Sequence, residues 1–267
     1  MIKLTKVIIA EIKRTRRDRL FAKSSYFNLL IWPIALLATT YYSYKPFNLK
    51  ESSVESLTNN DSVIAFLICG FLGYLCFFSL VESAWQMSRE RQNGTLEAIF
   101  LSPVNKIAIL YGRAVGNIVI NIWMFLCFTL FIIYFVKGVM VTNIIYLPVC
   151  FLVLIISAVI WGGFMNSIFL FSRDASILFN ILDEPMSIFS GVRMSTQVFP
   201  LWAKLISNIF PLTHSLIIVR GLMTGTDINT MAVIYYFVTN IAMIIITIFI
   251  YKSAERHSRK NGQLLFY

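Results

Sequence analysis

The chain has 267 residues, of which 58% are apolar, 15% are aromatic and only 13% are charged, and its net charge is +10. A soluble core of this length cannot bury so many apolar side chains, so the composition excludes an ordinary soluble protein. The bilayer is the expected solvent. The predicted fold class is an all-α integral membrane protein that forms a single transmembrane domain over residues 1–267.

Residues 1–23 are predicted to form a helix that lies in the inner headgroup layer of the membrane. Leu4, Ile8 and Ile12 recur one turn apart, and the following turns carry basic residues that suit anionic lipid. These basic residues are Lys13, Arg14, Arg16, Arg17 and Arg19. A plain positive-inside signal for membrane insertion is the alternative interpretation, and nucleic-acid binding is not expected.

Six charge-poor runs predict six membrane-spanning helices, since about 20 residues at 1.5 Å each cover a hydrocarbon core of about 30 Å. The predicted spans are residues 25–44, 62–84, 113–136, 146–171, 175–192 and 229–251. In this layout 17 of the 23 Lys and Arg residues fall on the cytoplasmic side. Both termini, including the tail 252–267, are therefore predicted to be cytoplasmic.

The four cysteines, Cys69, Cys76, Cys127 and Cys150, all fall inside apolar runs. Buried free cysteines usually behave as small hydrophobic residues. We therefore expect no disulfide and no metal site.

The first cytoplasmic loop, 85–112, is predicted to contain a compact surface helix over residues 96–101. Gly94 is a natural helix terminator, and Thr95 is a natural N-cap for the helix that follows. Glu97 falls in the first turn, where an acid suits the helix dipole.

A second helix start is predicted at Ser102 and Pro103, which would be the N-cap and first residue of the helix that becomes the third span. Glu90 is expected on the surface of the loop. Loop 85–112 would then form a rigid cytoplasmic projection, here called the knob, between the second and third spans. A solvated loop that binds nothing is the alternative interpretation.

The fifth predicted span carries Asp183, Glu184 and Pro185 at its middle. A charge at the centre of a span costs roughly 2.5–3.5 kcal/mol on insertion scales, so its presence needs a reason. One reading is a cation-attracting site in a transport pathway. The other is that Pro185 breaks the helix, and the acids are protonated or bonded to the freed backbone groups.

Residues 193–223 are apolar enough to enter lipid, but Pro200 and Pro211 cut them into pieces of about 10–12 residues. Pieces this short cannot cross a bilayer. The region is therefore predicted to form re-entrant or interfacial helices on the outer side, after a break at Ser190 and Gly191.

Two polar side chains in the outer region have competing interpretations. His214 is predicted to bond locally beside Pro211 and Thr213, and pH sensing is the alternative. Arg220 is predicted to anchor the chain at the interface, and contact with an anionic substrate is the alternative.

With these segments in order, the chain resembles the type 2 ABC transporter permeases. One signature is an inner pattern of acid, Gly-Thr, acid and Ser-Pro, formed here by Glu90, Gly94, Thr95, Glu97, Ser102 and Pro103. The other is an outer pattern, formed here by Ser190 to Val192, Pro200, Pro211 to His214, and Arg220 with Gly221. The resemblance covers nearly the whole chain.

The resemblance implies that loop 85–112 is a coupling helix that docks on an ATPase subunit. The chain has no G-x-x-x-x-G-K-[ST] phosphate loop, so ATP and Mg²⁺ are expected on a separate nucleotide-binding subunit, with no cofactor on this chain. A second permease chain, identical or related, should complete the pathway. The expected function is export of a drug, peptide, lipid or lipid-linked glycan across a bacterial cell membrane.

Two functions from other classes are alternatives to export. A membrane sensor or scaffold could bind a partner ATPase through the same knob without transporting anything. An integral membrane enzyme is disfavoured, because the chain has only two histidines, no H-E-x-x-H motif and no nucleophile elbow.

Overall fold

The computed structural model describes residues 4–19, 60–95, 105–118, 146–169, 175–224 and 230–261, with single positions between 31 and 42 and between 122 and 127. Within these residues every element is a helix and there is no strand, so the all-α fold class is confirmed. The elements are α1 (Leu4–Arg19), α3 (Asn60–Gln92), α5 (Lys106–Gly116), α7 (Leu147–Phe169), α8 (Ala175–Phe189), η4 (Thr196–Val198), α9 (Leu201–Ile209), α10 (Pro211–Thr224) and α11 (Thr230–Asn261).

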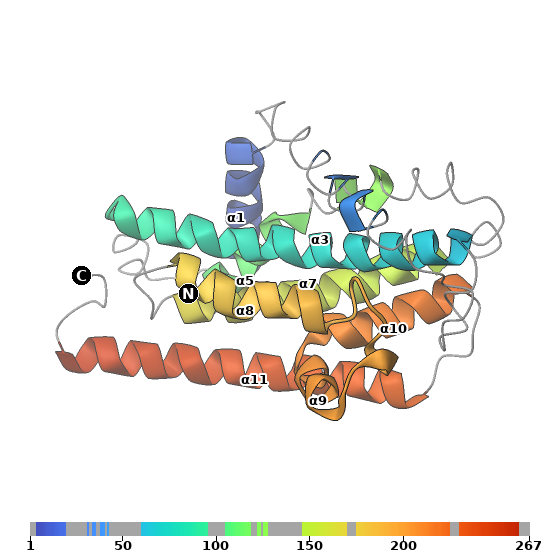
Figure 1. The fold of residues 1–267 in the computed structure, drawn as a ribbon. Coiled ribbons are helices and arrows are strands. Elements are labelled where there is room, and N and C mark those ends of the chain that lie inside the picture. The colour runs from blue at the N-terminus through green and yellow to red at the C-terminus, as the bar shows by residue number, and fades with distance from the viewer. Residues whose placement is uncertain are drawn as a thin grey trace.

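The long helices form a bundle, and α1 lies across it. Figure 1 shows α3, α7, α8 and α11 running in about the same direction along the long axis of the molecule, whereas α1 stands nearly at right angles to them. α7 is the central helix and packs against α3, α5, α10 and α11. The crosswise direction of α1 is the one expected of a helix that lies in the membrane plane while its neighbours cross the bilayer.

The core of the bundle is a large apolar cluster around α7. Trp161 and Met165 of α7 share this cluster with Phe71 and Phe77 of α3 and with Leu212 of α10. All five side chains are buried, and the Trp161 ring meets the edge of a neighbouring phenylalanine ring. Because α7 is apolar on all sides, it suits a helix surrounded by other helices within lipid.

The described residues contain two helices that are long and apolar enough to cross a membrane, namely α7 and residues 230–253 of α11. A third candidate is the pair α9 and α10, which is bent by 93° at its break. The first predicted span, 25–44, and most of the third, 113–136, lie outside the described residues. The six-span layout therefore stays a prediction.

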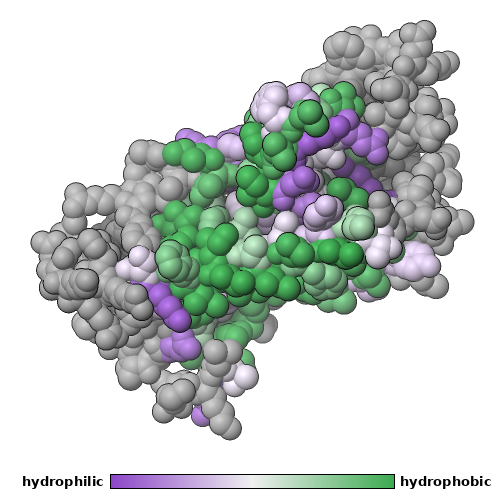
Figure 2. All heavy atoms as spheres, turned by 90° about the horizontal axis from the view of Figure 1, so that it is seen from below, coloured by the Kyte–Doolittle hydropathy of each residue, from purple (hydrophilic) through white to green (hydrophobic). Residues whose placement is uncertain are grey.

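The side of α11 that faces away from the other helices is apolar. Along α11 a series of large apolar side chains is exposed, from Met231 and Ile234 to Ile245 and Phe249. Figure 2 views the face on which α11 lies and shows hydrophobic residues across its middle. Soluble monomers seldom expose so broad an apolar surface, so this face suits contact with lipid tails or with another membrane-embedded chain.

Several helix ends lie away from the ends of the apolar runs. α3 continues to Gln92, beyond the predicted span end at 84, and α11 continues to Asn261 rather than 251. α5 already begins at Lys106, inside the predicted loop. Hydropathy marks where the chain leaves lipid, whereas a helix ends where its backbone pattern is broken, so the two boundaries differ.

Candidate coupling junction and outer re-entrant region

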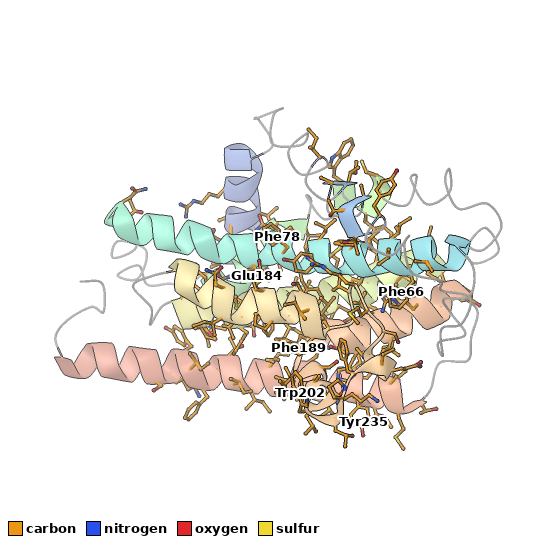
Figure 3. All side chains as sticks on the ribbon, in the orientation of Figure 1. Phe66, Phe78, Glu184, Phe189, Trp202 and Tyr235 are labelled. Carbon is orange, nitrogen blue, oxygen red and sulfur yellow. The ribbon has the colours of Figure 1, made fainter. Side chains whose placement is uncertain are left out.

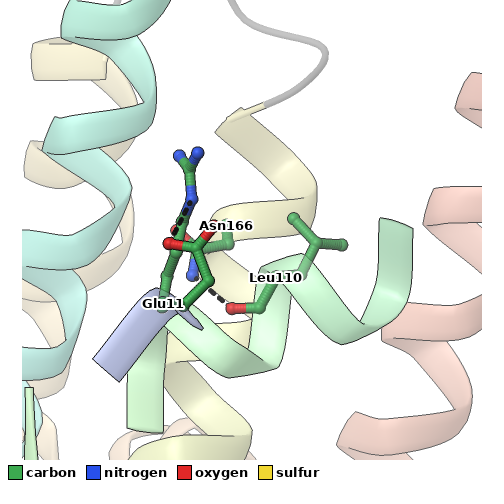
Figure 4. Close-up of polar contacts among 4 residues, drawn as sticks. Glu11, Leu110 and Asn166 are labelled. Carbon is green, nitrogen blue, oxygen red and sulfur yellow. Dashed lines mark hydrogen bonds and ion pairs between the residues drawn. The ribbon is translucent and has the colours of Figure 1, made fainter. Parts of the chain in front are cut away.

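α1 is held against α5 by close backbone packing and an ion pair, which Figure 4 shows in close-up. The two helices are in direct contact at Gly112 of α5, because a Cβ added there would lie 3.5 Å from the Cα of Ile8 and 3.5 Å from the Cβ of Glu11. Beside it, Nε of Arg113 lies 3.8 Å from Oε2 of Glu11. The Arg113 side chain is only 2% exposed and the Glu11 side chain 14%, so the pair is shielded from solvent.

α5 is in turn bonded to the two helices behind it. The side-chain amide of Asn166 in α7 donates a hydrogen bond to the carbonyl oxygen of Leu110, at 3.1 Å (Figure 4). The amide of Asn117, at the end of α5, donates to the carbonyl oxygen of Ser79 in α3, also at 3.1 Å. Among the described elements α1 therefore packs mainly on α5, which is bonded to α3 and α7.

The predicted coupling loop connects the end of α3 to the start of α5. Gly94 has φ of +68°, a left-handed conformation in which glycine is the least strained residue, so the predicted termination of the helix at Gly94 is confirmed. At the other end Asn105 caps α5, because its side chain accepts a hydrogen bond from the backbone N–H of Ile107 at 3.0 Å.

The remaining residues predicted for coupling have mixed outcomes. Thr95 is exposed and helical, and Glu90 lies in the last turns of α3, where its backbone alone is described. Glu97, Ser102 and Pro103 lie outside the described residues, so the short helix 96–101 stays a prediction. The prediction that the third-span helix is capped by Ser102 and begins at Pro103 is wrong, because Asn105 caps α5 and the helix begins at Lys106.

The predicted cuts in the outer region are all present. α8 ends at Phe189, and Gly191 follows with φ of +80°. Pro200 precedes α9, and Pro211 opens α10 after the 93° bend. Proline lacks a backbone N–H, so it fits the first position of a helix and cannot continue the one before it.

Arg220 joins two parts of the outer pattern, because its side chain contacts the backbone of Val192. Its Nη2 donates to the carbonyl oxygens of Phe66 and Val192, at 3.2 and 3.3 Å, and its guanidinium lies 3.5 Å from the centre of the Phe66 ring. The turn after α8 is thereby fastened to α3 by a residue of α10. The prediction that Arg220 is an interfacial anchor is wrong for this contact, since the side chain points into the protein, toward backbone carbonyls.

Gly70 of α3 makes this contact possible. A Cβ on Gly70 would lie 2.2 Å from the carbonyl oxygen of Val192 and 2.8 Å from Nη2 of Arg220. Only a residue without a side chain leaves room for the turn at this place.

Contacts between aromatic rings pack the end of α8 against α9 and the segment just before it. The Phe189 ring meets the edges of the Phe199 and Trp202 rings, with ring centres 6.4 and 6.0 Å apart. Figure 3 labels Phe189 and Trp202 near each other at this contact. Trp202 is 61% exposed, so its other side faces outward from the bundle.

The two acids of α8 lie in different surroundings. Asp183 is completely buried, and its Oδ2 accepts a hydrogen bond of 3.0 Å from the hydroxyl of Tyr74 in α3. Glu184 is exposed. The prediction that Pro185 breaks the helix is wrong, because α8 runs through Pro185 and ends only at Phe189. Packing of α8 against α3 and α9 holds the turn in place although proline removes one backbone bond.

Replacing Tyr74 with phenylalanine is expected to lower the free energy of unfolding by about 1–3 kcal/mol, because the buried Asp183 carboxyl loses its donor. The double variant Tyr74→Phe with Asp183→Leu should recover much of this loss, since both polar groups then leave the core together. Thermal unfolding of the purified chain in detergent measures both. Equal stability of Tyr74→Phe and the wild type would contradict a stabilising role for the hydrogen bond.

His214 bonds locally, as its neighbours in the sequence suggested. Its Nε2 lies 3.2 Å from the carbonyl oxygen of Asn208, and its ring stacks on that of Tyr235 in α11, 5.8 Å away between centres. The residue therefore joins the end of α9 to α10 and α11. Figure 3 labels Tyr235 of α11.

A comparison with known protein families identifies the family of this chain. The family model described as ABC-2 type transporter matches residues 4–224, from the start of α1 to the end of α10. The chain belongs to the ABC-2 type transporter family. No curated protein matches it. It is thus a membrane permease subunit of an ABC transporter and is not itself an ATPase.

Sequence reasoning missed the residues that connect α1 to the bundle of this ABC-2 permease. Arg113 contributed only to the count of basic residues on the cytoplasmic side, and Asn166 was treated as part of an apolar span. Glu11 offered the one available signal, because it is the only acid among the first 17 residues of a basic segment. An acid at such a place indicates a basic partner, but the sequence does not tell which one.

Proposed function

We propose that this chain is the membrane-spanning subunit of an ATP-driven exporter whose ATP is hydrolysed, with Mg²⁺, by a separate subunit. That subunit docks on the part of the predicted loop 85–112 that joins α3 to α5. Two permease chains, identical or related, form the pathway, and the cargo is an amphiphilic drug, peptide, lipid or lipid-linked glycan. The complex lies in a bacterial cell membrane with both termini of this chain in the cytoplasm.

The family match over residues 4–224 carries this proposal, because it includes both the inner and the outer signature. The geometry around the loop agrees with a coupling role. The end of α3 and the end of α11 lie at the same end of the bundle, as the predicted topology requires (Figure 1). A force on the loop would act directly on α3 and α5, because α5 is hydrogen-bonded to both α3 and α7 and α3 packs against α7.

The mechanism follows from this connection. When ATP binds, the two partner subunits close and displace the two loops, and the two bundles rock or separate so that cargo passes outward between them. In this mechanism the pair α9 and α10, which is bent by 93°, lies at the outer end of each bundle. On α1, Lys13 and Arg14 are exposed, which suits contact with anionic headgroups at the inner surface.

The test is to co-express the chain with candidate ATPase subunits, reconstitute the assembly in lipid vesicles, and record ATP hydrolysis against a panel of amphiphilic peptides, drugs and lipid-linked glycans. One cargo class should stimulate hydrolysis. Glu97→Lys should reduce this stimulation about tenfold, because it puts a positive charge in the first turn of the predicted coupling helix. The matched control is Glu55→Lys, the same charge change in the predicted outer loop, which should leave the stimulation unchanged.

Two outcomes would count against the proposal. A stable complex whose hydrolysis ignores every cargo would favour the sensor or scaffold. Full stimulation in Glu97→Lys would show that the loop is not the coupling element.

A further inference from the structure

The crossing of α1 and α5 combines three features that a simple membrane anchor does not need. The helices are in direct contact at Gly112, a small apolar cluster of Val7, Ala108 and Ile109 lies beside the crossing, and the Glu11–Arg113 ion pair completes the contact. A helix that only rests on the membrane would be held by its apolar side and its basic side chains. α1 is instead attached to one particular helix.

The ion pair fixes the register of this attachment. Apolar side chains make contacts that are not directional, so a helix held by them alone can slide or rotate. Two opposite charges shielded from water attract each other over a short range, and breaking such a pair costs free energy. A buried ion pair is therefore a poor way to gain stability and a good way to set one arrangement of two helices.

The attachment continues beyond α5 into the core. Arg113 lies one turn after Leu110, whose carbonyl oxygen accepts the hydrogen bond from Asn166 of α7. In the same region Gly163 of α7 lies under Tyr111, since a Cβ on Gly163 would be 2.3 Å from the tyrosine ring. α1, α5 and α7 thus meet in one continuous junction (Figure 4).

We propose that Glu11 and Arg113 are positioning residues that lock α1 to α5, so that both helices move as one body when the coupling loop is displaced. The loop ends at Asn105, directly before α5, so a push on the loop reaches Arg113 within two turns of helix. Asn166 then transmits the displacement to α7. This inference rests on the proposed function, because it assigns a path for the same coupling.

The test replaces the ion pair with a link that can be switched on and off. In the pair Glu11→Cys and Gly112→Cys, the two Cβ atoms lie about 3.5 Å apart in this structure, within the range of about 3.5–4.5 Å found in disulfides. The four native cysteines, Cys69, Cys76, Cys127 and Cys150, are first changed to alanine. The complex with its ATPase subunit is reconstituted in nanodiscs, and ATP hydrolysis is compared with that of the ATPase subunit alone.

The expected result depends on the redox state. With dithiothreitol the ion pair is absent and the link is open, so stimulation of hydrolysis by the permease should fall about tenfold. After oxidation with copper phenanthroline the disulfide restores the attachment, and stimulation should return to within about twofold of the cysteine-free parent. Because the same preparation is measured in both states, misfolding cannot explain the difference.

A charge swap, Glu11→Arg with Arg113→Glu, provides a second variant that needs no disulfide. Each single change should uncouple the complex, and the double variant should regain most of the stimulation because the pair is restored. The control is Asn240→Leu, which breaks a 2.9 Å hydrogen bond between α11 and Ser157 of α7 away from α1. It should lower the melting temperature without uncoupling.

The outcomes separate the two proposals. If the cysteine-free parent forms a complex but shows no stimulation, the proposed function fails and this inference fails with it. If the parent is stimulated and the reduced variant is stimulated equally, the locking role alone is overturned. Stimulation that stays low after oxidation would also overturn it, since the attachment would then have to open during the cycle.

Discussion

Replacing Gly70 with alanine is expected to destabilise the chain by about 3 kcal/mol, the upper end of the usual cost of overpacking. The new Cβ would lie 2.2 Å from the carbonyl oxygen of Val192, and a backbone atom in a tight turn cannot move aside as a side-chain end can. The turn after α8 would be forced away from α3, and Arg220 would lose its hydrogen bond to Val192. The measurement is the melting temperature of the purified chain in detergent.

The matched control is Gly73→Ala, one turn further along the same helix. There the added Cβ would meet a terminal methyl group of Leu216 at 2.6 Å, which can move by a change of rotamer. A smaller effect is expected, about 1 kcal/mol. If the two variants were equally stable, the close contact between Gly70 and the outer turn would be contradicted.

Replacing Gly94 with proline is expected to abolish the stimulation of ATP hydrolysis by the permease while the helical bundle stays folded. Gly94 has φ of +68°, and proline fixes φ near −65°, so the loop must leave α3 in another direction. Among the described residues no neighbour lies within 4 Å of a Cβ at this position, so the substitution is expected to act through the backbone path. ATP hydrolysis by the reconstituted complex, together with gel filtration of the permease, measures both parts.

Gly94→Asn is the control for this experiment, because asparagine tolerates the left-handed conformation better than other side chains do. It should keep most of the stimulation. Loss of stimulation in both variants would point to the glycine itself rather than to the direction of the loop. Full stimulation in Gly94→Pro would show that the shape of the loop does not matter for coupling.

Much of the architecture could be read from local signals. Apolar composition predicted helices in lipid, and Pro200, Pro211 and Gly191 predicted the broken outer region, because these residues act on their own backbone whatever surrounds them. Pro185 shows where such reasoning fails. It lies inside α8, since tertiary packing holds a helix together across one missing backbone bond.

Less of the candidate site could be predicted from the sequence. Gly94 was recognised as a helix end because its role is local, whereas Glu11, Arg113 and Asn166 were not recognised as partners. Glu11 and Arg113 are 102 positions apart, and Asn166 pairs with a backbone oxygen that has no signature in the sequence. Contacts between distant segments depend on how the helices cross, which no local pattern records.

The sequence by itself determined that this protein is helical, lies in a membrane and carries the two signatures of an ABC-2 permease, since each follows from composition or from residues within a few turns. Only the tertiary structure decided that Arg220 fastens the outer turn to α3 through Phe66 and Val192, and that Glu11 ties α1 to α5. The physical reason is that lipid favours any apolar helix equally. How the helices cross one another is determined by glycines that permit close approach and by the few polar side chains that need one particular partner.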